Sequence, residues 1–412
     1  MRKNITIIAA IIVLIGLGVT AYFFFFGTAP LSVSDTNNPF PSGTDTTTSG
    51  PSTINEETPT NTESTQGTTV APRLVRITQG PVALGFIASN FTKTISLADA
   101  SSTETTATAV SVRYVDRQSG NLYSYDASTR TATRVSNKTV PGVQEAVWTP
   151  DGGTAFLRYI AADSDGTMHV ETYALPENGE GGRVLDRDIN DVLVTGSTTL
   201  ITLLPSSSNS VAISATTDGT SARTLFTSEL SAITLRAGNP TFLIAYTKPS
   251  KELKGYLFLV NASSGAFTRL AGPLAALEGL PDPTGSRVLI SYTDASGFHL
   301  AVINVTSKEI TALPVTTLAE KCVWSSNGKS LYCAVPKDGF SNNMPDAWYR
   351  GTESFADRLW EVDFGARVAS LIADLPTLND SPVDAVGLTL DPRTTMLMFM
   401  NRIDGSLWTY SL

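Results

Sequence analysis

The ten residues VWTPDGGTAF at positions 147–156 return in similar form as VWSSNGKSLY at positions 323–332. In both copies a Val-Trp pair is followed by a hydroxyl residue, an Asp-Gly or Asn-Gly step and a second apolar stretch. Such a step between two apolar stretches is typical of a turn that joins antiparallel strands. Weaker echoes occur at 280–285 and 390–393. The stretch therefore predicts a repeated β-hairpin.

Seven further segments resemble one another and read as strands. They are LYSYD at 122–126, VETYA at 170–174, VAISA at 211–215, LFLVN at 257–261, LAVIN at 300–304, LWEVD at 359–363 and LWTYS at 407–411. Their starts are separated by 48, 41, 46, 43, 59 and 48 residues, which is close to the length of a four-stranded propeller blade. We therefore predict an all-β fold, a seven-bladed β-propeller over residues 73–412.

The two ends of this region predict how the ring closes. The last repeat stops at Leu412 after its third strand, whereas a closed ring must leave no exposed edge. The segment 73–79 contains RITQ at 76–79, which resembles the fourth-strand segments RVSN at 134–137 and RLAG at 269–272. We expect this N-terminal strand to complete the seventh blade, which a stacked β-solenoid would not require.

The W-[ST]-x-[DN]-G turns at Trp148 and Trp324 resemble the repeats of TolB-like propellers, which are grouped as WD40-like or PD40 repeats. The resemblance covers about residues 73–412, and only these two copies keep the Trp. It implies the propeller architecture and says little about activity, because propellers serve as enzymes, receptors and scaffolds. The overall layout also resembles membrane-anchored propellers of the bacterial envelope.

The N-terminus predicts a membrane anchor. After Arg2 and Lys3, residues 5–26 form an uncharged apolar stretch of 22 residues, long enough to cross a bilayer as a helix. The next basic residue is Arg73, so residues 1–4 are expected in the cytoplasm and the rest outside the membrane. A cleaved signal peptide is the alternative, but its apolar region is usually about 7–15 residues.

Residues 27–72 predict a disordered linker. Positions 28–72 hold 13 Thr, 6 Ser and 6 Pro, with no Lys or Arg. Such a composition buries too little apolar surface to offset the entropy lost on ordering.

Composition narrows the classes of function. The chain has 412 residues, 16% of them charged, and a net charge of −9, so a basic surface for nucleic acid is not expected. With two Cys and two His there is little material for a metal site, and we expect no cofactor. His169 and His299 precede repeated strand segments and are interpreted as structural, and the DSDG sequence at 163–166 as a polar turn rather than a calcium loop.

Cys322 and Cys333 flank the Asn327-Gly328 step, and a two-residue turn there would place them directly opposite each other. A three-residue loop would shift them by one position. An extracytoplasmic location favours oxidation, whereas direct opposition can strain a disulfide, so the sequence leaves their pairing open.

A long insertion at 336–357 separates the second and third strands of the sixth repeat. It carries Phe340, Trp348, Tyr349, Arg350 and Phe355, an aromatic and Arg mixture that is enriched at binding hot spots. These residues are the candidate binding site. Because exposed aromatic clusters are rare, folding back as a plug is the alternative, and the two roles are compatible.

The sequence is compatible with two main functions. The first is a non-catalytic module of the cell envelope that binds or scaffolds an envelope protein or glycan. The second is an envelope carbohydrate-active enzyme, a hydrolase or lyase, that uses loop carboxylates such as Asp116, Asp163, Asp338 and Asp346. A structural spacer that assembles through its blade rims is a third possibility. No nucleophile, zinc or phosphate-loop motif is present in the sequence.

Overall fold

The computed structural model describes residues 72–95, 105–206 and 209–412. The predicted spanning segment 5–26, and the predicted linker 27–72 apart from Pro72, lie outside these residues. Within the described part, none of the helices has both the length and the apolar character needed to cross a membrane.

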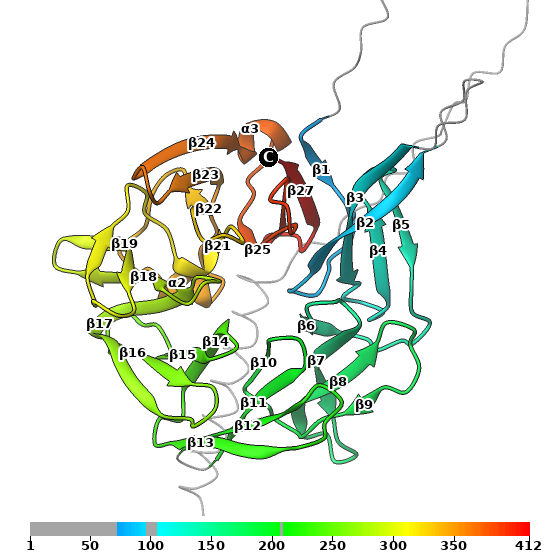
Figure 1. The fold of residues 1–412 in the computed structure, drawn as a ribbon, viewed down its shortest axis with the longest axis horizontal. Coiled ribbons are helices and arrows are strands. Elements are labelled where there is room, and N and C mark those ends of the chain that lie inside the picture. The colour runs from blue at the N-terminus through cyan, green and yellow to red at the C-terminus, as the bar shows by residue number, and fades with distance from the viewer. Residues whose placement is uncertain (1–71, 96–104, 207–208) are drawn as a thin grey trace, which may run out of the picture. The chain divides into compact units, whose positions relative to one another are not determined.

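The strands form antiparallel sheets arranged in a ring, which Figure 1 shows face-on. We number the blades in chain order. Blade 1 contains β2 (Ile87–Ile95), β3 (Thr105–Val115), β4 (Leu122–Asp126) and β5 (Thr131–Arg134). Blade 2 contains β6 (Val143–Trp148), β7 (Thr154–Ala162), β8 (Met168–Pro176) and β9 (Arg183–Val184). Blade 3 contains β10 (Asp191–Thr195), β11 (Thr199–Pro205), β12 (Ser210–Thr216) and β13 (Arg223–Ser228).

Blades 4 and 5 share one seven-stranded sheet. It contains β14 (Ile233–Asn239), β15 (Phe242–Thr247), β16 (Lys254–Asn261), β17 (Phe267–Pro281), β18 (Arg287–Asp294), β19 (Gly297–Asn304) and β20 (Ile310–Ala312). The first part of β17 pairs with β16 as the outer strand of blade 4, and its second part pairs with β18 as the inner strand of blade 5. Gly272 lies between the two parts, and its φ of 104° favours glycine.

Blade 6 contains β21 (Cys322–Trp324), β22 (Ser330–Pro336), β23 (Asp357–Asp363) and β24 (Val368–Asp374). Blade 7 contains β25 (Ala385–Leu390), β26 (Met396–Asn401), β27 (Leu407–Ser411) and β1 (Leu74–Arg76). Within the described ranges, three short helices accompany the strands, namely η1 (Ala319–Lys321), α2 (Asp346–Tyr349) and α3 (Leu375–Asn379).

The repeat pattern located the blades correctly. Each of the seven repeated segments lies in the third strand of its blade, namely β4, β8, β12, β16, β19, β23 and β27. The N-terminal strand also closes the ring, because β1 pairs antiparallel with β27 and Arg76 lies opposite Trp408. The strand itself is shorter than the predicted 73–79.

The Trp motif links one blade to the next. The indole Nε1 of Trp148 donates to the carbonyl oxygen of Gly85 at 3.2 Å, and that of Trp324 donates to the carbonyl oxygen of Leu280 at 3.3 Å. Both acceptors belong to the chain just before or within the preceding blade. The Trp therefore provides packing and an inter-blade hydrogen bond together.

The rest of the motif closes its turn. Ser325 accepts a hydrogen bond from the Ser330 N–H at 2.9 Å and donates to Asn327 Oδ1 at 2.9 Å. Thr149 and Asp151 make the same arrangement in blade 2. The connection in blade 6 spans four residues, 326–329, between paired Ser325 and Ser330, rather than the two or three residues considered from the sequence.

The core consists of apolar layers between adjacent blades. One cluster of buried side chains lies at each junction around the ring within the described residues, and Leu289 of blade 5 and Leu331 of blade 6 belong to one such layer. A further cluster lies apart from these junctions and contains residues of the 336–357 insertion.

Candidate functional site

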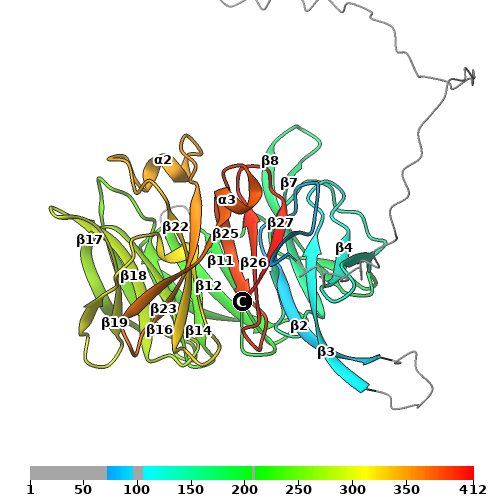
Figure 2. The ribbon, with the colours of Figure 1, turned by 90° about the horizontal axis from the view of Figure 1, so that it is seen from above.

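The 336–357 insertion connects β22 to β23 and contains α2, which projects from one face of the ring in Figure 2. Part of the insertion packs back onto the propeller. Trp348 is 4% exposed and Phe355 is 6% exposed. They join Leu318, Met344 and Val386, with Phe298, Phe340 and Met400 partly buried around them. Three of the five predicted site residues, Phe340, Trp348 and Phe355, therefore form a plug.

Aromatic contacts tie this plug to blade 5. The rings of Phe298, in β19, and Phe340 have centroids 4.6 Å apart. Phe340 meets Phe355 edge-on at 5.4 Å, and Phe355 stacks with Trp348 at 6.2 Å. The insertion is thus held by a continuous row of rings rather than by its short helix alone.

A buried ion cluster lies beneath the plug. The Nζ of Lys321 contacts Asp357 Oδ2 at 2.8 Å and Asp384 Oδ1 at 2.5 Å, and all three side chains are fully buried. Lys321 also donates to the carbonyl oxygen of Ala385 at 3.0 Å. Its ammonium lies 5.3 Å from the centre of the Trp348 ring. The cluster therefore joins η1, the start of β23 and the start of β25 under the aromatic layer.

Trp348 and Arg402 complete the attachment. The Trp348 Nε1 donates to Asp384 Oδ2 at 2.9 Å. Arg402, in the connection between β26 and β27, donates to the carbonyl oxygen of Trp348 at 2.6 Å, and its guanidinium lies 4.5 Å from the centre of the Trp348 ring.

Burial raises the pKa of Asp357 to about 6, although the Lys321 ammonium opposes the rise.

The remaining two predicted site residues are exposed. Tyr349 is 40% exposed and Arg350 is exposed, although both directly follow the buried Trp348. The insertion therefore combines a buried base with an exposed edge. Exposed aromatic and Arg side chains on a rigid support are the kind of groups that dominate binding energy at interfaces.

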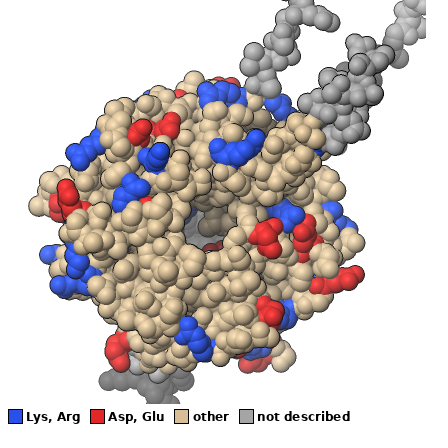
Figure 3. All heavy atoms as spheres, viewed as in Figure 1, with Lys and Arg blue, Asp and Glu red and all other residues tan. Residues whose placement is uncertain are grey.

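A cavity of about 460 Å³ lies beside this edge, at the centre of the ring. Figure 3 shows the ring hollowed at its centre, with charges of both signs scattered over the face around it. The lining comes from several blades and consists of Leu84, Gly85, Arg236, Leu280, Glu320, Cys322, Trp348, Tyr349, Val386, Gly387, Leu388, Thr389, Met400 and Arg402. Its wall is mostly apolar with few polar groups, which is the usual make-up of a ligand pocket.

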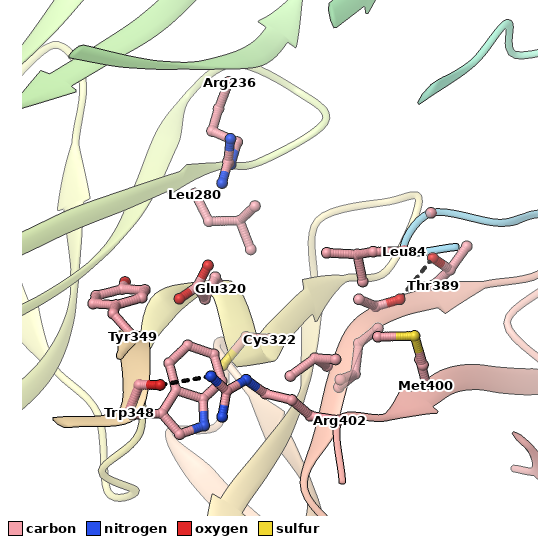
Figure 4. Close-up of a pocket in the computed structure, with 14 residues that line it drawn as sticks. Leu84, Arg236, Leu280, Glu320, Cys322, Trp348, Tyr349, Thr389, Met400 and Arg402 are labelled. Atoms are coloured by element: carbon pink, nitrogen blue, oxygen red, sulfur yellow. Dashed lines mark hydrogen bonds between the residues drawn. The ribbon is translucent and has the colours of Figure 1, made fainter. Parts of the chain in front are cut away.

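Two opposite charges face each other in this cavity. Figure 4 shows Arg236, from β14, and Glu320, from η1, pointing toward one another, with Tyr349 beside Glu320. The Oε1 atom of Glu320 is buried and has no hydrogen-bond partner among the described residues. Within the same part of the chain, the Arg236 guanidinium donates only to the carbonyl oxygen of Leu235, at 3.1 Å.

A second carboxyl group lies behind Glu320. Glu278, on β17, is 1% exposed and accepts a hydrogen bond from Ser291 at 3.3 Å. Burial and the nearby Glu320 raise the pKa of Glu278 well above its usual value. Glu278 therefore stands behind Glu320 and does not belong to the cavity lining.

The loop carboxylates considered for catalysis do not come together. Asp163 makes two hydrogen bonds to Arg187, and Asp346 accepts from the backbone of Lys251. Asp116 binds the backbone and hydroxyl of Ser119 within its own turn, and Asp338 is exposed. None of the four lines the cavity, because each serves a local turn or a neighbouring loop.

The two histidines lie on hairpins away from the cavity. His299 contacts both Ser296 and Asp294 through the same ring nitrogen, Nε2. A catalytic relay needs one ring nitrogen for the hydroxyl and the other for the carboxylate, so this grouping is not arranged as a triad. His169 lies near Asp163 and Glu171, and no cluster suited to a metal ion is found in the described ranges.

Cys322 and Cys333 lie opposite each other on β21 and β22 and are joined by a disulfide. Cys322 also lines the cavity, so the bond fixes the inner strand of blade 6 next to the plug.

Several residues of the site were not foreseen from the sequence, namely Arg236, Glu320, Lys321, Asp357, Asp384 and Arg402. One signal was available for Lys321. It stands two residues after the apolar pair Leu318 and Ala319 and directly before Cys322–Trp324, where a charged residue needs a buried partner. The partners themselves lie far away in the chain and carry no motif.

No protein-family model matches the chain, and the comparison with curated proteins gives no match either. Among solved structures, an oligogalacturonate lyase in complex with manganese is 10% identical over 80% of this chain and 98% of that chain, with a TM-score of 0.51. Oligogalacturonate lyase from Vibrio parahaemolyticus is 10% identical over the same shares, with a TM-score of 0.50. TolB from Acinetobacter baumannii is 11% identical over 69% of this chain and 78% of that chain, with a TM-score of 0.42. The likeness to the two lyases confirms the β-propeller fold expected from the TolB-like repeats, and at this identity it shows the fold alone.

Proposed function

We propose that this chain is a membrane-anchored, extracytoplasmic β-propeller that binds an envelope protein or glycan and has no catalytic activity of its own. The observation that carries the proposal is the build of the insertion. Its base is fixed by Trp348 and the buried Lys321 cluster, whereas Tyr349 and Arg350 remain exposed beside the central cavity. Rigid, exposed aromatic and Arg groups next to a pocket favour recognition.

The proposed location rests on the sequence. The uncharged stretch 5–26 is preceded by Arg2 and Lys3, and no basic residue follows it before Arg73. This asymmetry favours a cytoplasmic N-terminus and an outward-facing propeller. The disulfide between Cys322 and Cys333 is compatible with an oxidising compartment.

A second candidate is an enzyme that acts on an envelope carbohydrate, as a hydrolase or a lyase. The specific observation in its favour is the carboxyl pair Glu278 and Glu320, since neighbouring carboxyls with a raised pKa are common in catalytic sites. Because Glu278 is 1% exposed and only Glu320 lines the cavity, a substrate would meet a single carboxyl group. The binding function therefore ranks first.

The test is crosslinking in cells followed by mass spectrometry, comparing the wild-type protein with the double variant Tyr349→Ala/Arg350→Ala. Both side chains are exposed, so the melting temperature is expected to stay close to that of the wild type. The proposal predicts that a specific crosslinked partner disappears. An unchanged set of partners at unchanged stability would contradict it. Loss of polysaccharide cleavage in a Glu320→Gln variant would instead support the enzyme.

A further inference from the structure

The charged groups around the cavity are unequal in number. Arg236 is faced by three carboxyl groups, Asp191 from blade 3, Glu278 from blade 5 and Glu320 from η1, and by the phenol of Tyr246. The cluster therefore carries more acidic than basic groups. Burial raises the pKa of Asp191, and burial together with Glu320 raises that of Glu278. Both shifts are caused mainly by burial, which favours the neutral carboxyl group, so Glu320 is the carboxyl group of this cluster that the cavity itself presents.

The basic groups of the lining already have partners. Arg402 donates to the carbonyl oxygens of Trp348 and Glu353 and lies 3.8 Å from Asp384. Arg236 donates to the carbonyl oxygen of Leu235 and also lines a second cavity together with Asp191. Among the described residues that line the central cavity, the acceptor left without a partner is Oε1 of Glu320.

The walls next to Glu320 suit an aliphatic chain. Leu84, Leu280, Val386, Leu388 and Met400 line the same cavity. Tyr349 stands beside Glu320 in Figure 4, and an aromatic ring next to a carboxylate is a favourable environment for an ammonium ion. The cavity therefore brings apolar side chains together with an acceptor and an aromatic ring.

We propose that this cavity takes a primary alkylammonium group of the kind that ends a lysine side chain. The ammonium donates to Glu320 and lies against the Tyr349 ring, and the methylene chain packs along Leu280 and its apolar neighbours. The inference rests on the proposed function and names the group of the partner that enters the pocket. No bond is made or broken in this recognition.

The test is calorimetric titration of the full-length chain, purified in mild detergent, with Nα-acetyl-lysine methylamide. Its neutral counterpart acetylated on Nε and the analogous glutamate derivative are the matched ligands. The lysine probe is expected to bind, and the acetylated probe to bind at least about 10-fold more weakly, because a charge-assisted hydrogen bond is lost. Equal binding of the two lysine derivatives, or tighter binding of the glutamate derivative, would overturn the proposal.

Variants locate the binding. Glu320→Gln is expected to weaken binding of the lysine probe by about 10- to 100-fold. Arg236→Gln removes the cation that faces Glu320 and is expected to strengthen binding of the lysine probe. Glu252→Gln, at an exposed position outside the cavity, is the control and leaves binding unchanged. Unaltered affinity in a folded Glu320→Gln variant would rule out this site.

The two proposals can fail separately. If the lysine probe does not bind but Tyr349→Ala/Arg350→Ala still loses its crosslinked partner, the binding function stands and only the alkylammonium assignment is wrong. If the probe binds at Glu320 and the partners are unchanged, the pocket is assigned correctly and the recognition edge is wrong.

Discussion

The indole Nε1 of Trp348 donates a hydrogen bond of 2.9 Å to Oδ2 of Asp384. Trp348 belongs to the insertion of blade 6, and Asp384 directly precedes the first strand of blade 7. Because Asp384 also binds Lys321 at 2.5 Å, one carboxylate holds both the plug and the ion cluster beneath it. The position of the exposed neighbour Tyr349 is thus set by buried charge.

Removing the central cation should destabilise the fold. Lys321→Met leaves Asp357 and Asp384 buried without their common partner. Breaking a buried ion pair on one side typically costs about 3–5 kcal/mol, so we expect a loss of this size in the free energy of unfolding measured with denaturant. Lys329→Met, exposed on the same blade, serves as the control and should change stability by less than about 0.5 kcal/mol. Equal stability of the two variants would show that the ion cluster does not stabilise the fold.

The raised pKa of Asp357 predicts a pH dependence. Its folded value is about 6 against an ordinary 3.8, so the native state retains a proton that the unfolded chain has released. Asp357 therefore contributes stability below about pH 4 that is lost as the pH rises to about 6. The Asp357→Asn variant should lack this part of the pH dependence of the free energy of unfolding. Unfolding curves of both proteins between these pH values measure the difference. If the free energy of unfolding changes with pH in the same way in both proteins, Asp357 is charged in the native state throughout this range.

The disulfide of blade 6 should stabilise the fold. Cys322 and Cys333 are separated by 11 positions, and for loops of about this length the loss of unfolded-state entropy corresponds to roughly 3 kcal/mol. Comparison of oxidised and reduced wild-type protein isolates the bond, because the side chains are otherwise the same. We expect reduction to lower the unfolding free energy by about 2–3 kcal/mol. No change on reduction would mean that the bond is not formed in solution.

The repeated segments predicted the blades because propeller strands recur with the period of the fold. The pattern at 359–363 marked β23, and its late position revealed the insertion at 336–357. The continuous β17 was not predicted, because the local sequence does not show that one strand serves two blades.

The site was predicted only in part. The aromatic residues of the insertion stood out by type, but their division into buried Trp348 and exposed Tyr349 depends on blades 5 and 7. The acids were chosen from exposed loops, whereas the cavity uses Glu320, one residue before Lys321 and without a motif around it. Residues that meet across a ring come from separate blades, so sequence spacing does not identify them.

The membrane anchor makes a separate prediction. The intact protein should begin at its own N-terminus and stay in the membrane fraction after alkaline washing. Deletion of residues 1–26 should release it, because the apolar stretch 5–26 is the proposed attachment. Mass spectrometry of the mature N-terminus is the check. A start after position 29 would identify the segment as a cleaved signal peptide.

The most direct test of the recognition edge is site-specific photo-crosslinking in cells. A photoreactive amino acid is placed at position 349 and, as a control, at position 368, where Val368 is 54% exposed on the outer strand of the same blade. We expect one discrete adduct from position 349 that is abolished by Arg350→Ala, and no adduct of that mass from position 368. The same adduct from both positions, or none from position 349, would contradict binding at the insertion.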